Sequence, residues 1–503
     1  MPMRSFLGGA NQPPQGQPPQ AAAWHPMTLI REWFTEQHQG FRLADALTGV
    51  SVFGATGSGK TSGPAKHLAI GYLAAGFGGL VLCAKKEERR QWEQWAAETG
   101  RTGDLVIIDA AGTWRFNFLD WEAKRPGEGG GLTINIVALL DEIAAAVASG
   151  AGGDPESGGD AKFFEDALHH LNTNLVDLAV FTRLPLTLDL LRKIVTTAPQ
   201  SIAQMEDTEW AGKKSFCMAA LARAELRLAE AGDDPEALKD FQECKIYWTL
   251  EFPNLSEKTR SIIVLMFSML ARPILSRPLR RLFADDTNIT PEAAHDGKVI
   301  IVDLPVQEYR LVGRIANLIW KYCFQVATLR RSPPLNGYLR PSFLWCDEAQ
   351  NFVSRFDAEY QAVARSAGGC TVYLTQNRES YRRVLKDDDS VDALLGNLQC
   401  KIFCQNTGGT NEWAAGLLGE AWVQVYGSSI GHQQAHTEQG GHSTPSAGVN
   451  ISEQRKFLVE PSRFTTLRRG GPKNNFLVDC IVYNGGEIFP TGQSHTLLTF
   501  TQR

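Results

Sequence analysis

A chain of 503 residues, of which 43% are hydrophobic and 21% charged, has the composition of an ordinary globular protein and is long enough for two or three domains. Its formal net charge of -5 excludes a uniformly basic coat for nucleic acid, so any such contact must be local. Nine cysteines without metal-ligand or disulfide spacing indicate a reducing compartment.

Residues 1–40 are predicted to form a disordered leader followed by a short helix. Gly8–Gln20 is rich in Gln and Pro and lacks the apolar segment of a signal peptide, whereas Trp24–Phe41 has a mixed helical pattern. No integral membrane span is predicted, because the most apolar window, Ala69–Ala84, is broken by four glycines.

The segment Gly54–Thr61 reads GATGSGKT and matches the phosphate-binding pattern G-x-x-x-x-G-K-[ST] in full. It lies between an apolar strand, Val50–Phe53, and a helix that includes Pro64–Ala69, which is the context that the motif requires. Lys60 would reach the β- and γ-phosphates of ATP, and Thr61 would offer its hydroxyl to Mg²⁺. The residues predicted to contact the nucleotide are Gly54, Gly57, Ser58, Gly59, Lys60, Thr61 and Ser62.

Further strands, Leu80–Cys83 and Leu105–Asp109, alternate with helical patterns and predict an α/β fold with a parallel, doubly wound sheet. We expect the first part of this nucleotide-binding core to span residues 41–130. The charged run Lys85–Arg90 leaves two interpretations open: a solvated start of a helix, or a charged rim near the nucleotide or a polymer.

Residues 131–292 are predicted to form an inserted all-helical domain, because apolar residues recur there every three or four positions. The core resumes with the strand Val299–Asp303 and fills residues 293–503. At its end, Phe476–Tyr483 and Glu487–Phe489 flank Asn-Gly-Gly and predict a terminal β-hairpin.

Two strands of the second core part end in polar residues. Ser342–Cys346 runs into Asp347 and Glu348, and Cys370–Leu374 is followed by Gln376. Ligands bind at the carboxyl ends of parallel strands. We expect Asp347 to order the Mg²⁺ shell, Glu348 to polarise the attacking water, and Gln376 to sense the γ-phosphate.

Arg365 lies at the end of a predicted helix, Asn351–Ser366, and has two possible roles. It is either a cation that stabilises the helix C-terminus or an arginine finger for the nucleotide of a neighbouring subunit. The sequence does not decide between them.

The segment Gly427–Gly448 is poor in apolar residues and is predicted to be a flexible loop. His432 and His436 would share one face of a helix and could bind a metal there, but the surrounding Gly, Gln and Ser argue against a helix.

In their order and spacing, these segments resemble the TraG and TraD family of type IV secretion coupling proteins, within the clan that includes FtsK and HerA. The segments that carry the resemblance are Gly54–Thr61, FNFLDW at Phe116–Trp121, KVIIVDLP at Lys298–Pro305, FLWCDEAQNF at Phe343–Phe352, ARSAGG at Ala364–Gly369 and YLTQ at Tyr373–Gln376.

The resemblance implies a RecA-like P-loop core and a homohexameric ATPase that uses ATP and Mg²⁺ to pump single- or double-stranded DNA for secretion or conjugation. By the same resemblance, Lys60, Glu348, Gln376 and a trans-acting Arg365 would be catalytic, and Thr61 and Asp347 would hold the metal. Secretion-channel or relaxase-type proteins would be its partners. The basic residues that would grip DNA, or else belong to solvated faces, are Arg272, Arg277, Arg280, Arg281, Arg378, Arg382, Arg383 and Lys386.

Members of the family commonly carry an N-terminal membrane anchor, and none is predicted in this chain. We therefore expect a cytoplasmic form that is recruited peripherally to the inner membrane. Two alternatives stay open: a related translocase in DNA processing or defence, and a nucleotide-gated receptor for protein cargo.

Overall fold

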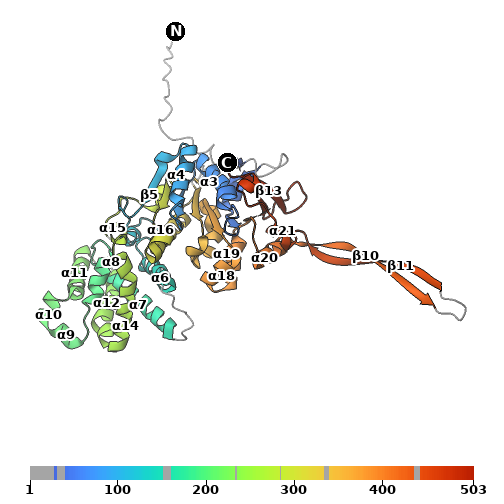
Figure 1. Ribbon diagram of the computed structural model, residues 1–503. Helices are drawn as coiled ribbons and strands as arrows, with labels where there is room; N and C mark the ends of the chain where they lie inside the picture. The colour runs from blue at the N-terminus through green and yellow to red at the C-terminus, as the bar shows by residue number, and fades with distance from the viewer. Residues whose placement is uncertain are drawn as a thin grey trace, which may run out of the picture.

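The computed structural model describes residues 28–30, 40–150, 160–232, 235–283, 285–333, 339–435 and 442–503. These residues form a central sheet, a helical lobe on one side of it and a long two-stranded ribbon that projects from the opposite side (Figure 1). No helix in this part of the chain is both long and apolar enough to cross a membrane.

The central sheet has nine strands in the order β13-β12-β9-β3-β8-β7-β4-β6-β5. The seven strands from β9 to β5 are parallel, and β12 and β13 extend the β9 edge in antiparallel pairing. The bounds are β3 (Val50–Phe53), β4 (Gly78–Leu82), β5 (Leu105–Ile108), β6 (Val299–Val302), β7 (Ser342–Cys346), β8 (Gly369–Thr375), β9 (Cys400–Phe403), β12 (Leu477–Asn484) and β13 (His495–Thr501).

Helices cover both faces of the parallel strands, which explains why these strands are continuously apolar rather than alternating. On one face, α3 (Lys66–Ala74) and α4 (Glu88–Glu98) pack their buried apolar side chains on the sheet. On the other face lie α16 (Val306–Leu329), α17 (Phe356–Val363), α18 (Arg378–Leu385), α19 (Asp388–Asn397) and α20 (Gly409–Leu418). The predicted α/β fold with a parallel sheet is confirmed.

Between β5 and β6 the described residues form helices and turns. The helix α6 (Thr133–Gly150) contacts both α16 of the core and α7 (Asp160–Phe181), and so joins the helical lobe to the sheet. The remaining helices of this stretch are α5 (Phe118–Ala123), α8 (Leu188–Thr196), α9 (Ile202–Glu206), α10 (Thr208–Lys213), α11 (Phe216–Ala231), α12 (Pro235–Ile246), η4 (Tyr247–Glu251), α13 (Phe252–Asn254), α14 (Glu257–Ile274), α15 (Leu279–Phe283) and η5 (Pro291–Ala294). The predicted domain boundaries at 131 and 292 stay predictions.

The N-terminal helix predicted at Trp24–Phe41 is wrong where the structure describes that segment. Thr28–Ile30 forms the strand β1, which pairs with β2 (Phe41–Arg42). Ile30 is buried against Gly71 of α3, so packing on the core decides the conformation rather than helix propensity. The rest of the predicted leader lies outside the described residues, apart from Gly40.

Two predictions near the C-terminus are also wrong. The segment Gly427–Gly448 is no loop: most of it belongs to β10 (Glu420–Ala435) and β11 (His442–Phe457), which pair in antiparallel register as the projecting ribbon. His432 therefore lies in a strand, while His436 is outside the described residues. The terminal hairpin does form, but β12 pairs with β13 rather than with residues 487–489, because a longer loop separates the two strands.

Candidate functional site

The phosphate-binding loop leaves the carboxyl end of β3, in the middle of the sheet, and enters a helix at Thr61. Gly57 and Gly59 have φ values of +73° and +86°, which glycine adopts without strain. The backbone N–H groups of Gly57, Gly59 and Lys60 have no hydrogen-bond partner among the described residues. Together with the helix N-terminus, they form a cradle suited to an anion.

The C-terminal hairpin backs this loop and explains the need for glycine at position 59. A Cβ atom at Gly59 would lie 2.6 Å from Val478 Cγ2 and 3.0 Å from the carbonyl oxygen of Arg469. The neighbouring Ser58 is buried, and its hydroxyl has no hydrogen-bond partner in the described structure. A phosphate oxygen in the cradle would give this hydroxyl an acceptor, so the loop fits the predicted ligand.

Thr61 and Asp347 meet as the sequence predicts for a metal site. The Thr61 hydroxyl donates to Asp347 Oδ2 over 2.8 Å, although β8 separates their strands in the sheet. The described residues hold no group of three or more His, Cys, Asp or Glu side chains that could bind a metal. A two-residue oxygen shell suits Mg²⁺, which keeps most of its waters and takes further ligands from phosphate.

Glu348 is held next to Asp347 in an uncommon backbone conformation. Its φ is +51°, and its N–H donates to Asp347 Oδ1 over 2.8 Å. Non-glycine residues in the left-handed region cost free energy and cluster at functional sites. This conformation points to a role for Glu348 beyond ending the strand.

Four side chains surround the Glu348 carboxylate. Lys60 Nζ lies 3.5 Å and Lys85 Nζ 2.7 Å from Oε1, while Gln350 Nε2 and Gln376 Nε2 donate to Oε2 over 2.9 and 3.4 Å. Burial alone raises the pKa of Glu348, but the charges of the two lysines and the hydrogen bonds from Lys85 and Gln350 outweigh it and lower this pKa to about 2. The carboxylate is therefore ionised and shared between two cations.

Lys85 is the site residue that the sequence does not single out. It follows β4, the neighbour of β7 in the sheet, and its Nζ also lies 3.9 Å from Asp347 Oδ2. Glu88 accepts from the backbone N–H groups of Ala84 and Lys85 over 3.0 and 3.2 Å and fixes this turn. Burial, followed by the charge of Asp347, raises the pKa of the Glu88 carboxyl well above its usual range. The sequence leaves two interpretations of the run Lys85–Arg90 open, a solvated helix start and a charged rim near the nucleotide. Lys85 fits the second, because its ammonium group lies at the site.

Arg365 does not join this cluster within one chain. The helix α17 ends at Val363, earlier than predicted, and Arg365 lies in a short turn just before β8, whereas Gln376 follows the carboxyl end of that strand. The exposed Arg365 is therefore at the opposite edge of the sheet from Glu348. Both of its predicted roles stay predictions.

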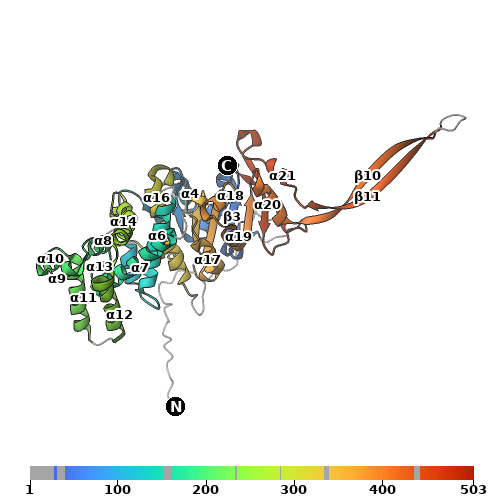
Figure 2. The same ribbon diagram turned by 90° about the horizontal axis from the view of Figure 1, so that it is seen from below.

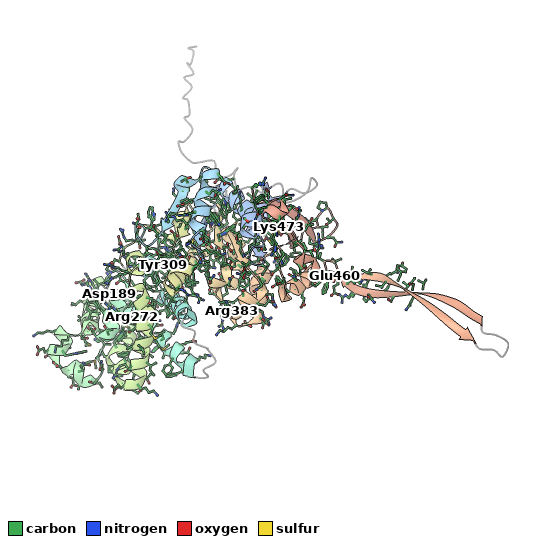
Figure 3. All side chains as sticks on the ribbon, in the orientation of Figure 1. Asp189, Arg272, Tyr309, Arg383, Glu460 and Lys473 are labelled. Atoms are coloured by element: carbon green, nitrogen blue, oxygen red, sulfur yellow. The ribbon has the colours of Figure 1, made fainter. Side chains whose placement is uncertain are left out.

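Two of the basic residues predicted to grip DNA are engaged within the chain. Arg378 pairs with Asp392 and lies 5.8 Å from the ring centre of Trp413, and Arg382 pairs with Asp388. Arg383, on the same helix, is exposed and is labelled at the rim of the core in Figure 3. Contact of this cluster with DNA stays a prediction.

Residues 341–469 match the family model described as the TraM recognition site of TraD and TraG. This segment contains Asp347, Glu348 and Gln376. The chain resembles the TraG and TraD coupling proteins, as the sequence predicts. No curated protein matches the chain.

Solved structures of a coupling protein share the fold. The unbound monoclinic form of the bacterial conjugative coupling protein TrwBdeltaN70 matches with a TM-score of 0.54 at 14% identity, covering 91% of this chain and 86% of that chain. The plasmid coupling protein TrwB in complex with the non-hydrolysable GTP analogue GDPNP matches with a TM-score of 0.52 at 14% identity, covering 94% and 91%. TrwB in complex with ADP and Mg²⁺ has the same TM-score and identity, covering 94% and 89%. The predicted RecA-like core is thereby confirmed.

Proposed function

We propose that this chain is an ATP-hydrolysing motor of type IV secretion or conjugation that recruits and pumps DNA or a DNA–protein substrate. The observation that carries the proposal is the meeting of Lys60, Thr61, Asp347, Glu348 and Gln376 at one edge of the sheet. These groups provide the charges and hydrogen bonds that phosphoryl transfer to water requires. The fold shared with a coupling protein solved with nucleotides supports the same function.

The phosphates of ATP would lie in the cradle of backbone N–H groups, with the Lys60 ammonium beside them. Thr61 and Asp347 would hold Mg²⁺, whose charge, when bound, offsets that of the phosphate oxygens. Because the Thr61 hydroxyl donates to Asp347, the two ligands are held side by side before a cation arrives.

Glu348 would act on the attacking water. Lys60 and Lys85 keep its carboxylate ionised and weakly basic, and phosphate oxygens compete for the same two ammonium groups. Binding of ATP would therefore release Glu348 and raise its pKa, so that it can accept a proton from the water that attacks the γ-phosphorus. Gln376 donates to the same carboxylate and would sense, by hydrogen bonding, whether the γ-phosphate is present.

We also propose that the chain forms a homo-oligomer. The resemblance to the TraG and TraD family implies a hexamer. Arg365 is exposed and remote from the nucleotide loop of its own chain, which is what a finger for a neighbouring copy requires. The matching family model is described as a recognition site for another protein, TraM, which supports a protein partner; that this partner is of the relaxase or secretion-channel type is part of the proposal. Such a partner would also recruit the chain to the inner membrane.

The test is steady-state ATP hydrolysis by the full chain with and without single- and double-stranded DNA, beside Lys60→Ala and Glu348→Gln. We expect stimulation by DNA that falls with salt and is absent in both variants. Hydrolysis that DNA leaves unchanged at every protein concentration would refute the pump.

The family-model description, a recognition site for another protein, favours one second candidate: a nucleotide-gated receptor for protein cargo. Cargo capture that depends on nucleotide and on the matched segment, residues 341–469, but not on DNA, would support it. In that case ATP turnover is slow and insensitive to either strand form.

A further inference from the structure

The C-terminal hairpin places two residues at the edge of the sheet where the phosphate-binding loop lies. The strand β12 runs antiparallel to β9, and β9 runs parallel to β3, so β12 begins at the edge where β3 ends. Leu477, the first residue of β12, pairs with Thr501, the last residue of β13. Phe476 and Gln502, which flank this pair, therefore lie at the ligand edge. In both ribbon views the chain end marked C lies on the core and away from the tip of the projecting ribbon (Figures 1 and 2).

Gln502 joins this hairpin to the helix that leaves the phosphate-binding loop. Its Oε1 accepts from the backbone N–H of Gly471 over 2.7 Å, and this bond fixes the orientation of the amide, because a backbone nitrogen can only donate. Its Nε2 therefore donates to Ser62 Oγ, over 2.6 Å. Since Ser62 Oγ accepts this bond, its own proton stays free for a phosphate oxygen.

The direction of a bound nucleotide follows from the arrangement of the strands. The γ-phosphate would lie toward Glu348, which follows β7. In the sheet, β7 and β8 lie on one side of β3, whereas β9, β12 and β13 lie on the other. A triphosphate that extends across the loop from Glu348 to Ser62 therefore directs its ribose and base toward the edge formed by β12 and β13.

The turn at this edge, residues 470–476, has an uncommon backbone. Asn475 and Phe476 are consecutive non-glycine residues with φ values of +53° and +60°. Such residues cost free energy and are concentrated at functional sites. The Arg503 guanidinium lies over the half-buried Phe476 ring, 4.4 Å from its centre. Because Arg503 is exposed and its guanidinium is planar, this face of the ring is accessible to another planar group, such as a nucleobase.

We propose that the turn 470–476 binds the nucleoside of the nucleotide, with the base stacked on Phe476 in place of Arg503. Gln502 is a positioning residue that holds the turn and the Ser62 hydroxyl together. Stacking of a base on an aromatic side chain contributes affinity with little preference for one base. The inference rests on the proposed function, because it assigns the other end of the same ligand, and it adds recognition of a nucleoside to that of the phosphates.

The first test compares the binding of ADP and of pyrophosphate, each with Mg²⁺, to the full chain by titration calorimetry. Pyrophosphate has the two phosphates without the nucleoside, and neither ligand presents a γ-phosphate for hydrolysis. We expect Phe476→Ala to weaken ADP binding about tenfold and to leave pyrophosphate binding within about twofold. Phe476→Tyr keeps the aromatic ring and should retain the affinity for ADP. In Phe476→Ala, an equal loss for both ligands, or a loss for neither, overturns the proposal.

The second test measures Gln502→Ala in the same titrations, beside the matched control Gln399→Ala. Gln399 also donates through Nε2, to the carbonyl oxygen of Gly396 over 2.7 Å, but it precedes β9 and so lies at the opposite edge of the sheet. We expect Gln502→Ala to weaken ADP binding more than pyrophosphate binding, and the control to change neither. Equal losses for the two ligands in Gln502→Ala would overturn its role in holding the turn for the nucleoside.

The unmodified chain separates this inference from the proposed function. We expect it to bind ADP more tightly than pyrophosphate. Equal affinity for the two ligands would overturn the nucleoside site and leave the proposed motor standing. Binding of neither ligand would contradict the proposed ATP hydrolysis as well.

Discussion

Lys85 Nζ lies 2.7 Å from Glu348 Oε1, the same carboxylate oxygen that Lys60 Nζ approaches to 3.5 Å. One oxygen is thus shared between a lysine of the phosphate-binding loop and a lysine that follows a different strand. The second lysine helps to keep the carboxylate ionised, so under the proposed function we expect its removal to affect ATP hydrolysis and not only stability.

Lys85→Met is expected to lower kcat/KM for ATP by about 10- to 100-fold, because the phosphates lose one of two cations. It also removes a charge that lowers the pKa of Glu348, so the acid limb of the kcat/KM profile should move to higher pH. The control is Lys86→Met, since Lys86 is 64% exposed and reaches Glu308 only at 4.0 Å. Identical pH profiles for the unmodified chain and Lys85→Met would contradict the role.

Glu348 should make stability depend on pH. Its folded pKa of about 2 lies below the ordinary value of 4.5, so its ionised form stabilises the fold above pH 4.5, and this contribution is lost as the pH falls toward 2. We expect the difference in urea midpoint between the unmodified chain and Glu348→Gln to shrink from pH 6 to pH 3. A difference that stays constant across this range would show that the two lysines do not hold the carboxylate.

Gly59→Ala should abolish nucleotide binding and destabilise the fold, because its Cβ would collide with Val478 and with the backbone of Arg469. Gly100→Ala is a matched control: Gly100 has a similar φ of +70°, but no described atom lies within 4 Å of a Cβ placed there. We expect the control to lose about 1 kcal/mol from backbone strain alone. Equal losses, measured by urea unfolding and by titration with a fluorescent nucleotide, would mean that the contact with Val478 is unimportant.

We expect the buried ion pair between Lys321 and Asp357 to contribute more to the free energy of unfolding than a surface ion pair does. Lys321 Nζ lies 2.6 Å from Asp357 Oδ2, both side chains are 1% exposed, and Asp357 also accepts from Gln325 and Tyr373. Lys321→Met leaves a buried carboxylate without its cation and should cost about 3–5 kcal/mol of unfolding free energy.

The control for this pair is Lys213→Met. Its partner Glu209 is 71% exposed, so the loss should stay below about 1 kcal/mol. The measurement is chemical denaturation of both variants. Similar losses of unfolding free energy would mean that the Lys321–Asp357 pair contributes no more than a surface ion pair.

The sequence predicts the parts of the site that lie within one strand and its following turn. The loop Gly54–Thr61 and the pair Asp347 and Glu348 each follow an apolar strand, and Thr61 does contact Asp347. Lys85 could not be singled out in this way, because its role depends on β4 lying beside β7, and the order of strands in a sheet is not contained in local spacing.

The errors near the C-terminus have a similar origin. Between Gly427 and Gly448 the residues are mostly small or polar, so the sequence does not show the alternation of apolar and polar residues that is typical of a strand. The strands β10 and β11 nevertheless pair along their whole length. For the terminal hairpin, Asn484-Gly485-Gly486 predicts a tight turn, but Phe489 is buried in the core and the chain returns only at His495. Packing at a distance overrides the turn signal in that case.

The contact between Gly59 and Val478 also has a consequence for biosynthesis. During translation the phosphate-binding loop leaves the ribosome long before β12, and a growing chain exposes the loop without the strand that backs it. Fragments that stop short of β12 would carry every motif residue of the site and still hold nucleotide poorly. If Val478 is needed to shape the loop, as the contact indicates, the proposed ATP turnover would begin only after nearly the whole chain has been made.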